Sequence, residues 1–243
     1  MNYSFLQCGE GALTVHLGDG IDPAINRRVT ALQGAIGSAG LRGTTDLIPA
    51  YADLTVCYDC TVISAKALQR QLRRLLDSLS VAGQDRRRVF RLPVCYGGDY
   101  GPDLDFVCRH SGLSAQEVIA LHSAPDYLIY MLGFLPGFAY LGGLDPRLHT
   151  PRLDSPRTCI PAGSVGIGGA QTGVYPLASP GGWQLLGRTP VSVFDRQRQE
   201  PILYRAGDLV HFVPISPAEY EEIARAVAAG TYTVQVEEVS VCD

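Results

Sequence analysis

Lysine is almost absent from this chain of 243 residues, which contains a single one, Lys66, so every other basic residue apart from histidine is arginine. No lysine stands in a G-x-x-x-x-G-K-[ST] motif, and the sequence therefore has no phosphate-binding P-loop. Lys66 falls in a helical pattern with a polar face, which argues against a lysine that forms a Schiff base with a substrate. P-loop chemistry is thus excluded and Schiff-base chemistry is disfavoured.

Other absences narrow the class of protein further. No apolar run approaches the ~20 residues that span a bilayer, and a net charge of −4 provides no basic field for nucleic acid or an acidic membrane. Residues 1–10 have neither the basic start nor the apolar core of a signal peptide, so we expect a cytoplasmic chain. Its seven cysteines, odd in number and irregularly spaced, then indicate reduced thiols.

The first part of the chain alternates between strand and helix patterns. Asp22 is positioned to cap a helix that has Pro23 at its first position, and Ser64 opens a second helix with a leucine stripe. The patterns predict strands at 12–17, 45–51, 54–58 and 89–95. The resulting order, β-α-β-β-α-β, is typical of a ferredoxin-like α+β domain. We therefore predict such a domain over residues 1–90.

The remainder of the chain, residues 91–243, has a different texture. Short helices are predicted at 103–110 and from Ser114, which forms a capping box with Glu117, and a longer one at 217–229. Between and after them, short apolar segments alternate with Gly and Pro turns, at 127–132, 163–167, 184–186, 191–194, 209–213 and 234–241. This pattern favours a β-barrel or sandwich as the second domain.

The densest run of Gly and Pro lies at 133–190 and includes the single tryptophan, Trp183, and four arginines. Gly permits close approach and positive φ, whereas Pro fixes φ. Apolar residues are interleaved throughout, unlike in a disordered linker. The run therefore predicts a shaped surface of turns, where binding residues tend to lie.

The same run carries motifs that identify a family. They are GFLPGF at 133–138, YLGG at 140–143, PAGSV at 161–165, QTG at 171–173, SPGGW at 179–183 and GRTP at 187–190. Further pieces, GEGAL at 9–13, DPAIN at 22–26 and PVCYGG at 93–98, extend the match over nearly the whole chain. The sequence closely resembles the family of the bacterial 5-oxoprolinase B subunit, kinase A inhibitor and allophanate hydrolase subunit 1.

This resemblance implies a cyclophilin-like β-barrel for the second domain and a role as the B subunit of a multi-subunit, ATP-dependent 5-oxoprolinase, which cleaves 5-oxo-L-proline to L-glutamate. It further implies the A and C subunits of 5-oxoprolinase as partners, and ATP with Mg bound in the complex, the chain being inactive alone. Two alternatives stay open: a non-enzymatic inhibitor of a sporulation-type histidine kinase, and a subunit of allophanate or urea metabolism. The Met-Lys-Met setting of a biotin carrier, known from the related urea carboxylases, is absent.

Arg152 and Arg157 are the first candidates for a binding site. Each follows a proline, and guanidinium groups on such stiffened loops bind carboxylate or phosphate in a bidentate way. The two arginines predict an anion clamp for 5-oxoproline, for ATP phosphates or for a phosphorylated intermediate. The alternative is that they pair with Asp145, Asp154 or another acidic residue of the chain.

Further candidates are polar residues among the small ones. Gln171 and Thr172 follow a glycine-rich loop whose N–H groups suit an anion, although close strand packing explains the glycines equally well. Ser164 lacks the G-x-S-x-G elbow of a nucleophile. His122 is a candidate base or a structural histidine, and Arg188 completes the candidate set. No histidine pair has zinc spacing, so we expect no metal site, and the catalytic residues stay unassigned.

Overall fold

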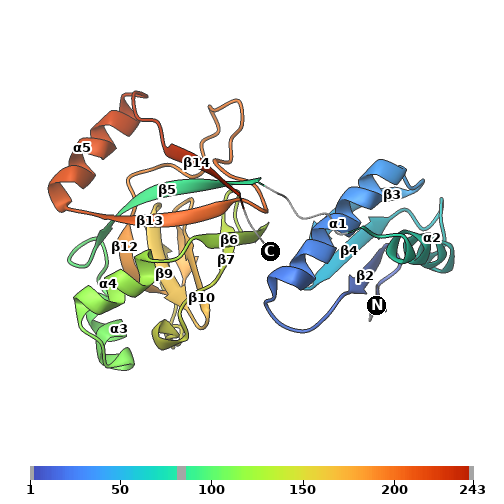
Figure 1. The fold of residues 1–243 in the computed structure, drawn as a ribbon, viewed down its shortest axis with the longest axis horizontal. Helices are drawn as coiled ribbons and strands as arrows, with labels where there is room; N and C mark the ends of the chain where they lie inside the picture. The colour runs from blue at the N-terminus through green and yellow to red at the C-terminus, as the bar shows by residue number, and fades with distance from the viewer. Residues whose placement is uncertain (1–2, 81–85, 241–243) are drawn as a thin grey trace. The chain divides into compact units, whose positions relative to one another are not determined.

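The computed structural model describes residues 3–80 and 86–240, which form two compact units with a boundary between Gln84 and Asp85 (Figure 1). The boundary predicted at residue 90 falls inside the first strand of the second unit. Within the described residues, every helix is too short or too polar to cross a membrane.

The first unit is a four-stranded antiparallel sheet in the order β1-β2-β4-β3, with two helices packed on one face (Figure 1). Its elements are β1 (Ser4–Cys8), β2 (Ala12–His16), α1 (Pro23–Ala39), β3 (Thr44–Pro49), β4 (Asp53–Tyr58) and α2 (Ala65–Asp77). The predicted caps are present: the Asp22 side chain accepts from Ala24 N, and that of Ser64 accepts from Ala67 N. Gly40, with φ of 55°, ends α1.

Apolar side chains on alternate strand positions and on one stripe of each helix form the core of this unit. They are fully buried or nearly so, and comprise Leu13, Val15, Leu17, Val29, Leu32, Ile36, Leu54, Val56, Tyr58, Ile63, Leu68, Leu72 and Leu76. The leucine stripe read from the sequence is therefore the inner face of α2.

The predicted ferredoxin-like pattern is not confirmed, because its last strand lies elsewhere. The sheet position beside β2 is taken by β1, an exposed strand that the sequence patterns missed. The segment predicted to fill it, 89–95, belongs instead to the second unit, where Phe90, Leu92 and Val94 are buried in the main core. Such a nearly continuous apolar run suits a strand that is covered on both faces. In the first unit, helices cover only one face of the sheet.

The second unit is built on an eight-stranded sheet in the order β10-β9-β12-β5-β13-β6-β7, with β14 paired to β5. Its strands are β5 (Arg86–Tyr96), β6 (Tyr127–Leu132), β7 (Ala139–Gly142), β9 (Ser164–Gly168), β10 (Gln171–Val174), β12 (Gln184–Arg188), β13 (Leu209–Ile215) and β14 (Gln235–Ser240). A separate pair joins β8 (Arg157–Ile160) to β11 (Ser179–Gly181). The helices are α3 (Leu104–Ser111), α4 (Ala115–Ser123), α5 (Pro217–Ala228) and the short 3₁₀ helix η1 (Pro146–Leu148).

β5 is the central strand of this sheet. One edge pairs in parallel with β13 over its whole buried length, and the two run side by side in Figure 1. The other edge pairs with β14 up to Arg91 and with β12 from Cys95. Pro93, which has no N–H to donate, falls in the gap between these two partners. A proline is tolerated in a central strand here because that edge has no ladder bond to lose.

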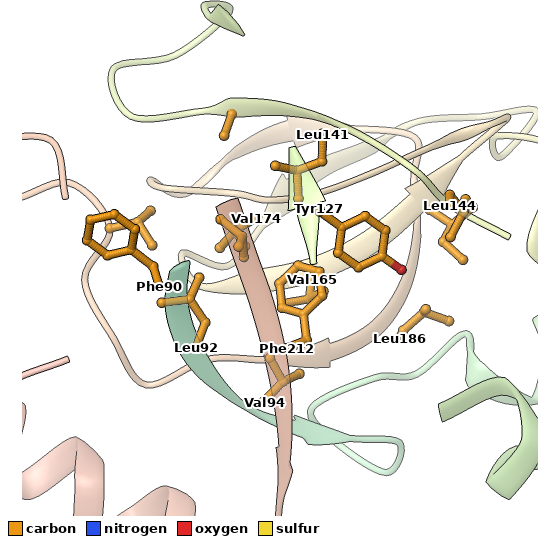
Figure 2. Packing of buried hydrophobic residues seen from close by; sticks show 14 of the residues in the cluster. Phe90, Leu92, Val94, Tyr127, Leu141, Leu144, Val165, Val174, Leu186 and Phe212 are labelled. Atoms are coloured by element: carbon orange, nitrogen blue, oxygen red, sulfur yellow. The ribbon is translucent and has the colours of Figure 1, made fainter. Parts of the chain in front are cut away.

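The sheet closes nearly into a barrel, since its two ends, β7 and β10, lie against each other. Figure 2 shows side chains from the surrounding strands meeting inside, among them Leu92 of β5, Tyr127 of β6, Val165 of β9 and Phe212 of β13. This nearly closed barrel is consistent with the cyclophilin-like fold that the family resemblance implies.

Most predicted elements of this unit are present, including the Ser114–Glu117 capping box of α4. The strand predicted at 191–194 is wrong: this segment has a single isolated bridge, between Phe194 and Ile202. Its valines are buried, but they fill the core from a loop that follows Pro190. The strands β7, β8, β10 and β11 were not predicted, because Gly and Pro interrupt their alternation.

Candidate functional site

The first wall of the site is the loop at 133–138 between β6 and β7. Leu135 N donates to Gly133 O at 2.7 Å, which is the hydrogen bond of a γ-turn, and Phe134 at its centre has φ of 65°. Among the described residues it is the one non-glycine with positive φ. A bulky residue in this conformation stores strain on the order of 1–3 kcal/mol. Strain of this kind is concentrated at functional sites, and the Phe134 side chain is 65% exposed.

A second turn completes this loop. Phe138 N donates to Leu135 O at 2.9 Å, with Pro136 and Gly137 as the central residues. Gly137 has φ of 84°, which the third position of a type II turn requires. The two turns together bring Phe134 and Phe138 edge to face, with ring centroids 5.5 Å apart. The two turns of the GFLPGF motif therefore position two aromatic rings against each other.

The loop that carries Arg152 is tied down on both sides. Thr150 and Gly169 exchange backbone hydrogen bonds of 3.2 and 2.8 Å, and Leu153 N donates to Gly182 O at 2.7 Å. Arg152 thus extends from a backbone that is already fixed. Fixing the backbone in advance lowers the entropy that would be lost when its guanidinium group binds an anion.

These loops enclose a pocket of about 130 Å³, which we call the aromatic pocket. It combines aromatic rings with one cation and two glycines, and is lined by Phe134, Phe138, Tyr140, Arg152, Tyr175, Gly181, Gly182 and Trp183. Pockets for drug-sized ligands usually measure about 300–1,000 Å³. The aromatic pocket therefore suits a small molecule and is too small for a nucleotide.

Phe138 lies at the centre of the rings of the aromatic pocket. It makes edge-to-face contacts with Tyr140, Tyr175 and Trp183 at centroid distances of 5.2, 5.7 and 5.5 Å. Tyr175 and Trp183 also meet edge to face, at 5.9 Å. Each such pair contributes about 0.5–1.5 kcal/mol beyond the burial of its area. The rings hold one another in place, so the walls are formed without a ligand.

Arg157 is bound to a carboxylate of the chain itself. Its Nη2 donates to Asp103 Oδ1 at 2.7 Å, and its Nη1 donates to Trp183 O at 3.3 Å. The second carboxylate oxygen of Asp103 accepts from Leu185 N at 2.7 Å. This geometry matches the alternative in which an acidic residue pairs with the arginine, and Arg157 does not line the aromatic pocket. It braces the backbone at Trp183, just before β12.

Arg152 is the arginine of the aromatic pocket, and its guanidinium carbon lies 6.0 Å from the centroid of the Trp183 ring. Such a separation is a cation–π contact. In residues 3–80 and 86–240, no acidic side chain lies within ion-pair distance of Arg152. By contrast, the guanidinium of Arg147 is held by Asp145 at 2.7 Å. The cation of Arg152 is therefore available to an anionic ligand.

His122 is buried in the core of the barrel. Its Nδ1 lies 2.9 Å from the Tyr96 hydroxyl and its Nε2 lies 2.7 Å from Thr172 Oγ1. Because Thr172 Oγ1 donates to Gly166 O at 3.0 Å, the hydrogen-bond pattern assigns the proton of His122 to Nε2. Burial lowers the pKa of His122 to about 3. These are the features of a structural histidine, and Thr172 is engaged in the same network.

The remaining candidates lie outside the aromatic pocket. Ser164 and Arg188 are opposite each other on β9 and β12. The Oγ of Ser164 is buried and has no hydrogen-bond partner in the described part of the chain. Arg188 lies beside Tyr220, whose pKa is raised by burial against the effect of that cation. Gln171 is half-buried at the start of β10. The structure therefore does not bring the predicted set together around Arg152.

Sequence reasoning selected Arg152 but missed the aromatic residues that surround it. Trp183, noted in the sequence only as the single tryptophan, is 5% exposed and lines the aromatic pocket. A signal for the others was present in the motifs, where aromatic residues stand next to Gly and Pro, namely Phe134, Phe138, Tyr140 and Tyr175.

Gly168 leaves the space that the Trp183 ring occupies. A Cβ at position 168 would lie 2.2 Å from Trp183 Nε1 and 2.4 Å from its Cδ1, so the ring must move. We expect Gly168→Ala to distort the aromatic pocket and to lower the free energy of unfolding by roughly 1–3 kcal/mol. The fluorescence of Trp183, the single tryptophan, measures the displacement directly.

Gly133→Ala is the matched control for this substitution. Its Cβ would meet Tyr140 Cε2 at 3.6 Å, an ordinary contact. We expect native-like emission from this variant, and an equal change in both variants would contradict the role assigned to Gly168.

Metal ligands do not gather in the described residues: no three His, Cys, Asp or Glu side chains in 3–80 and 86–240 are grouped closely enough to hold an ion.

Comparison with known proteins first identifies the class of domain to which this chain is similar. Residues 3–204 match the family model described as carboxyltransferase domain, subdomain C and D. Curated relatives then give the family. The 5-oxoprolinase B subunit of Bacillus subtilis is 42% identical over 90% of this chain and 96% of its own. That of Escherichia coli O157:H7 is 45% identical over 85% and 93%. The chain belongs to the family of 5-oxoprolinase B subunits.

Several solved structures are also similar to this chain. TTHA0988 is 41% identical with a TM-score of 0.74, and the match covers 84% of this chain but 40% of that chain. The protein PH0987 from Pyrococcus horikoshii is 42% identical with a TM-score of 0.54, covering 89% and 100%. The K. lactis urea amidolyase, at 23% identity and a TM-score of 0.83, covers 98% of this chain and 16% of its own, and shows a shared fold.

Proposed function

We propose that this chain is the B subunit of a multi-subunit, ATP-dependent 5-oxoprolinase, which opens the lactam of 5-oxo-L-proline to give L-glutamate. The observation that carries the proposal is the similarity, at 42–48% identity, to three proteins named as 5-oxoprolinase B subunits. The Bacillus subtilis and Escherichia coli relatives are matched over nearly their whole length. In this chain the family motifs also form the walls of a pocket.

The A and C subunits of 5-oxoprolinase are the proposed partners. The name of the relatives implies an assembly of several subunits. In TTHA0988 and in the K. lactis urea amidolyase, the region similar to this chain is 40% and 16% of a longer polypeptide. Those proteins join the region covalently to further sequence. A separate subunit would supply the equivalent part here.

Two pockets in the described residues bear on where ATP and Mg bind. The aromatic pocket is too small for a nucleotide, and the described residues hold no cluster of metal ligands. A more open hollow of about 540 Å³ beside Phe194 contains Arg205 and Glu200, but these two side chains are paired with each other at 2.7 Å. We propose that the nucleotide binds in the complex, on the partners or on surfaces that they complete.

Reconstitution tests the proposal. The chain is co-expressed with candidate A and C subunits, and ADP release is measured with and without 5-oxoproline. We expect turnover from the full assembly and none from this chain alone, because no complete catalytic set is present in residues 3–80 and 86–240. Assemblies that lack this chain are the control. Substantial turnover by the isolated chain, or full activity without it, would overturn the proposed role.

A second candidate function is a part in urea or allophanate metabolism. It is favoured by weaker similarity to a putative urea carboxylase of Emericella nidulans, 27% identical over 97% of this chain but 22% of that protein. Replacing 5-oxoproline by urea or allophanate in the same assay separates the two. The kinase-inhibitor hypothesis and the cytoplasmic location stay predictions. An inhibitor would bind its kinase by itself, whereas an enzyme subunit would co-purify with the C subunit.

A further inference from the structure

The aromatic pocket combines three properties that together restrict its ligand. Its volume of about 130 Å³ admits a molecule the size of one small ring. Its walls are mainly aromatic faces and edges, which favour apolar CH groups. Its charged side chain is Arg152, whose guanidinium has no carboxylate partner in the described part of the chain. A ligand that satisfies all three is a compact ring with one negative charge.

The glycines of the pocket add a constraint on shape. Gly181 has no room for a side chain, because a Cβ there would lie 2.6 Å from the Tyr175 hydroxyl oxygen and 2.7 Å from Ile160 Cδ1. At this position and at Gly182 the wall is therefore backbone, which a ligand can approach closely. Backbone groups at one side and the cation of Arg152 at another suit a ring that carries polar atoms on its edge.

We propose that the aromatic pocket binds 5-oxoproline, with Arg152 paired to its carboxylate and the methylene groups of the lactam ring against Phe138 and Trp183. This inference rests on the proposed function and assigns the site within it. The arginine fork binds carboxylate in a bidentate way. The same cation disfavours ligands with a positive charge, so the neutral lactam nitrogen of 5-oxoproline is distinguished from the ammonium group of proline.

Phe134 forms the mouth of the pocket in this arrangement. Its strained γ-turn holds a ring that is 65% exposed directly beside Phe138. A bound ring covers part of the apolar surface that Phe134 leaves open. The exposed ring and the unpaired cation thus belong to one binding surface.

Trp183 provides the first test, because it is the single tryptophan and lines the pocket. The full chain is titrated with 5-oxo-L-proline, with 2-pyrrolidinone, which lacks the carboxylate, and with L-proline, which has an ammonium group. We expect saturable change in emission with 5-oxoproline and binding roughly 10- to 100-fold weaker with the other two, the range expected for a charge-assisted pair. Trp183→Phe removes the signal and controls for optical effects.

Arg152→Ala is the decisive variant, and Arg147→Ala is its matched control. Arg147 lies in the same segment but is paired to Asp145 and does not line the pocket. In the reconstituted complex we expect Arg152→Ala to raise KM for 5-oxoproline by roughly 10- to 100-fold without raising KM for ATP. Arg147→Ala should leave both values unchanged.

The outcomes separate this inference from the proposed function. A complex that turns over 5-oxoproline with unchanged KM in Arg152→Ala overturns the pocket assignment and leaves the function standing. Absence of turnover, together with Arg152-dependent binding of 5-oxoproline by the full chain, supports the pocket and overturns the function. If the complex is inactive and the chain binds neither 5-oxoproline nor 2-pyrrolidinone, the pocket assignment fails as well.

Discussion

Lowering the pH from about 7 to about 4 should destabilise the second unit steeply, because His122 is neutral in its core. Burial places the pKa of His122 at about 3 in the folded chain, whereas an unfolded histidine has a pKa of about 6.5. Between these values the unfolded state binds the proton and the folded state does not. The stabilisation is therefore complete above about pH 6.5 and falls as the pH drops towards about 3, by up to about 1.4 kcal/mol per unit.

The measurement is denaturant unfolding, followed by Trp183 fluorescence at several pH values. In His122→Gln, an amide that does not titrate replaces the imidazole next to Tyr96 and Thr172. We expect a lower free energy of unfolding at pH 7 but a flatter dependence on pH than in the wild type. The low pKa of Asp145, held at about 2 mainly by Arg147, affects both proteins equally.

The exposed His110 provides the control for this comparison. His110→Gln should follow the wild-type profile, because its side chain lies at the surface of α3. Parallel profiles for wild type and His122→Gln would show that His122 does not control the acid sensitivity.

Removing the carboxylate of Asp103 should be the most disruptive single change near the site. Asp103 binds Arg157 Nη2 and Leu185 N, both at 2.7 Å, and so joins the start of α3 to β8 and β12. Asp103→Ala leaves the half-buried guanidinium of Arg157 without a counter-charge and a backbone N–H without an acceptor. We expect a loss of roughly 2–4 kcal/mol in the free energy of unfolding, with a shift in Trp183 emission.

Asp105→Ala is the control, because Asp105 is an exposed carboxylate in the first turn of the same helix. It should cost less than about 1 kcal/mol, the usual contribution of a charge at a helix end. Thermal or denaturant unfolding compares the two variants directly. A loss in Asp105→Ala as large as in Asp103→Ala would mean that helix charge, not the link to Arg157, accounts for the effect.

Local signals in the sequence were sufficient for the helices. Asp22 with Pro23, Ser64, and the Ser114–Glu117 pair each mark a helix start by chemistry that acts within a few residues. Asp103 shows the limit of such signals: it occupies the N-cap position of α3 but makes no capping bond, because its oxygens bind Arg157 and Leu185. A partner more than fifty positions away decides its role.

The pairing of the strands and the composition of the pocket also depend on contacts between residues that are far apart in the sequence. The apolar run at 89–95 was predicted as a strand, which it is, but its alternation does not state which sheet it joins. The aromatic pocket likewise combines residues of the 133–140 segment with Arg152, Tyr175 and Trp183. Each motif was visible in the sequence. That the motifs line one pocket follows only from how the loops fold back on one another.

The parallel pairing of β5 with β13 determines when the barrel can form. Val89 lies beside Leu209, so about three quarters of the second unit's sequence separates two adjacent strands. Contacts between such distant segments require closure of a long loop and slow the folding of a domain. During synthesis, β5 leaves the ribosome long before β13 and waits with Phe90, Leu92 and Val94 uncovered. The first unit, complete by α2, can fold in that interval, whereas the barrel stays open until β13 has been made, and exposed apolar strands of this kind favour aggregation.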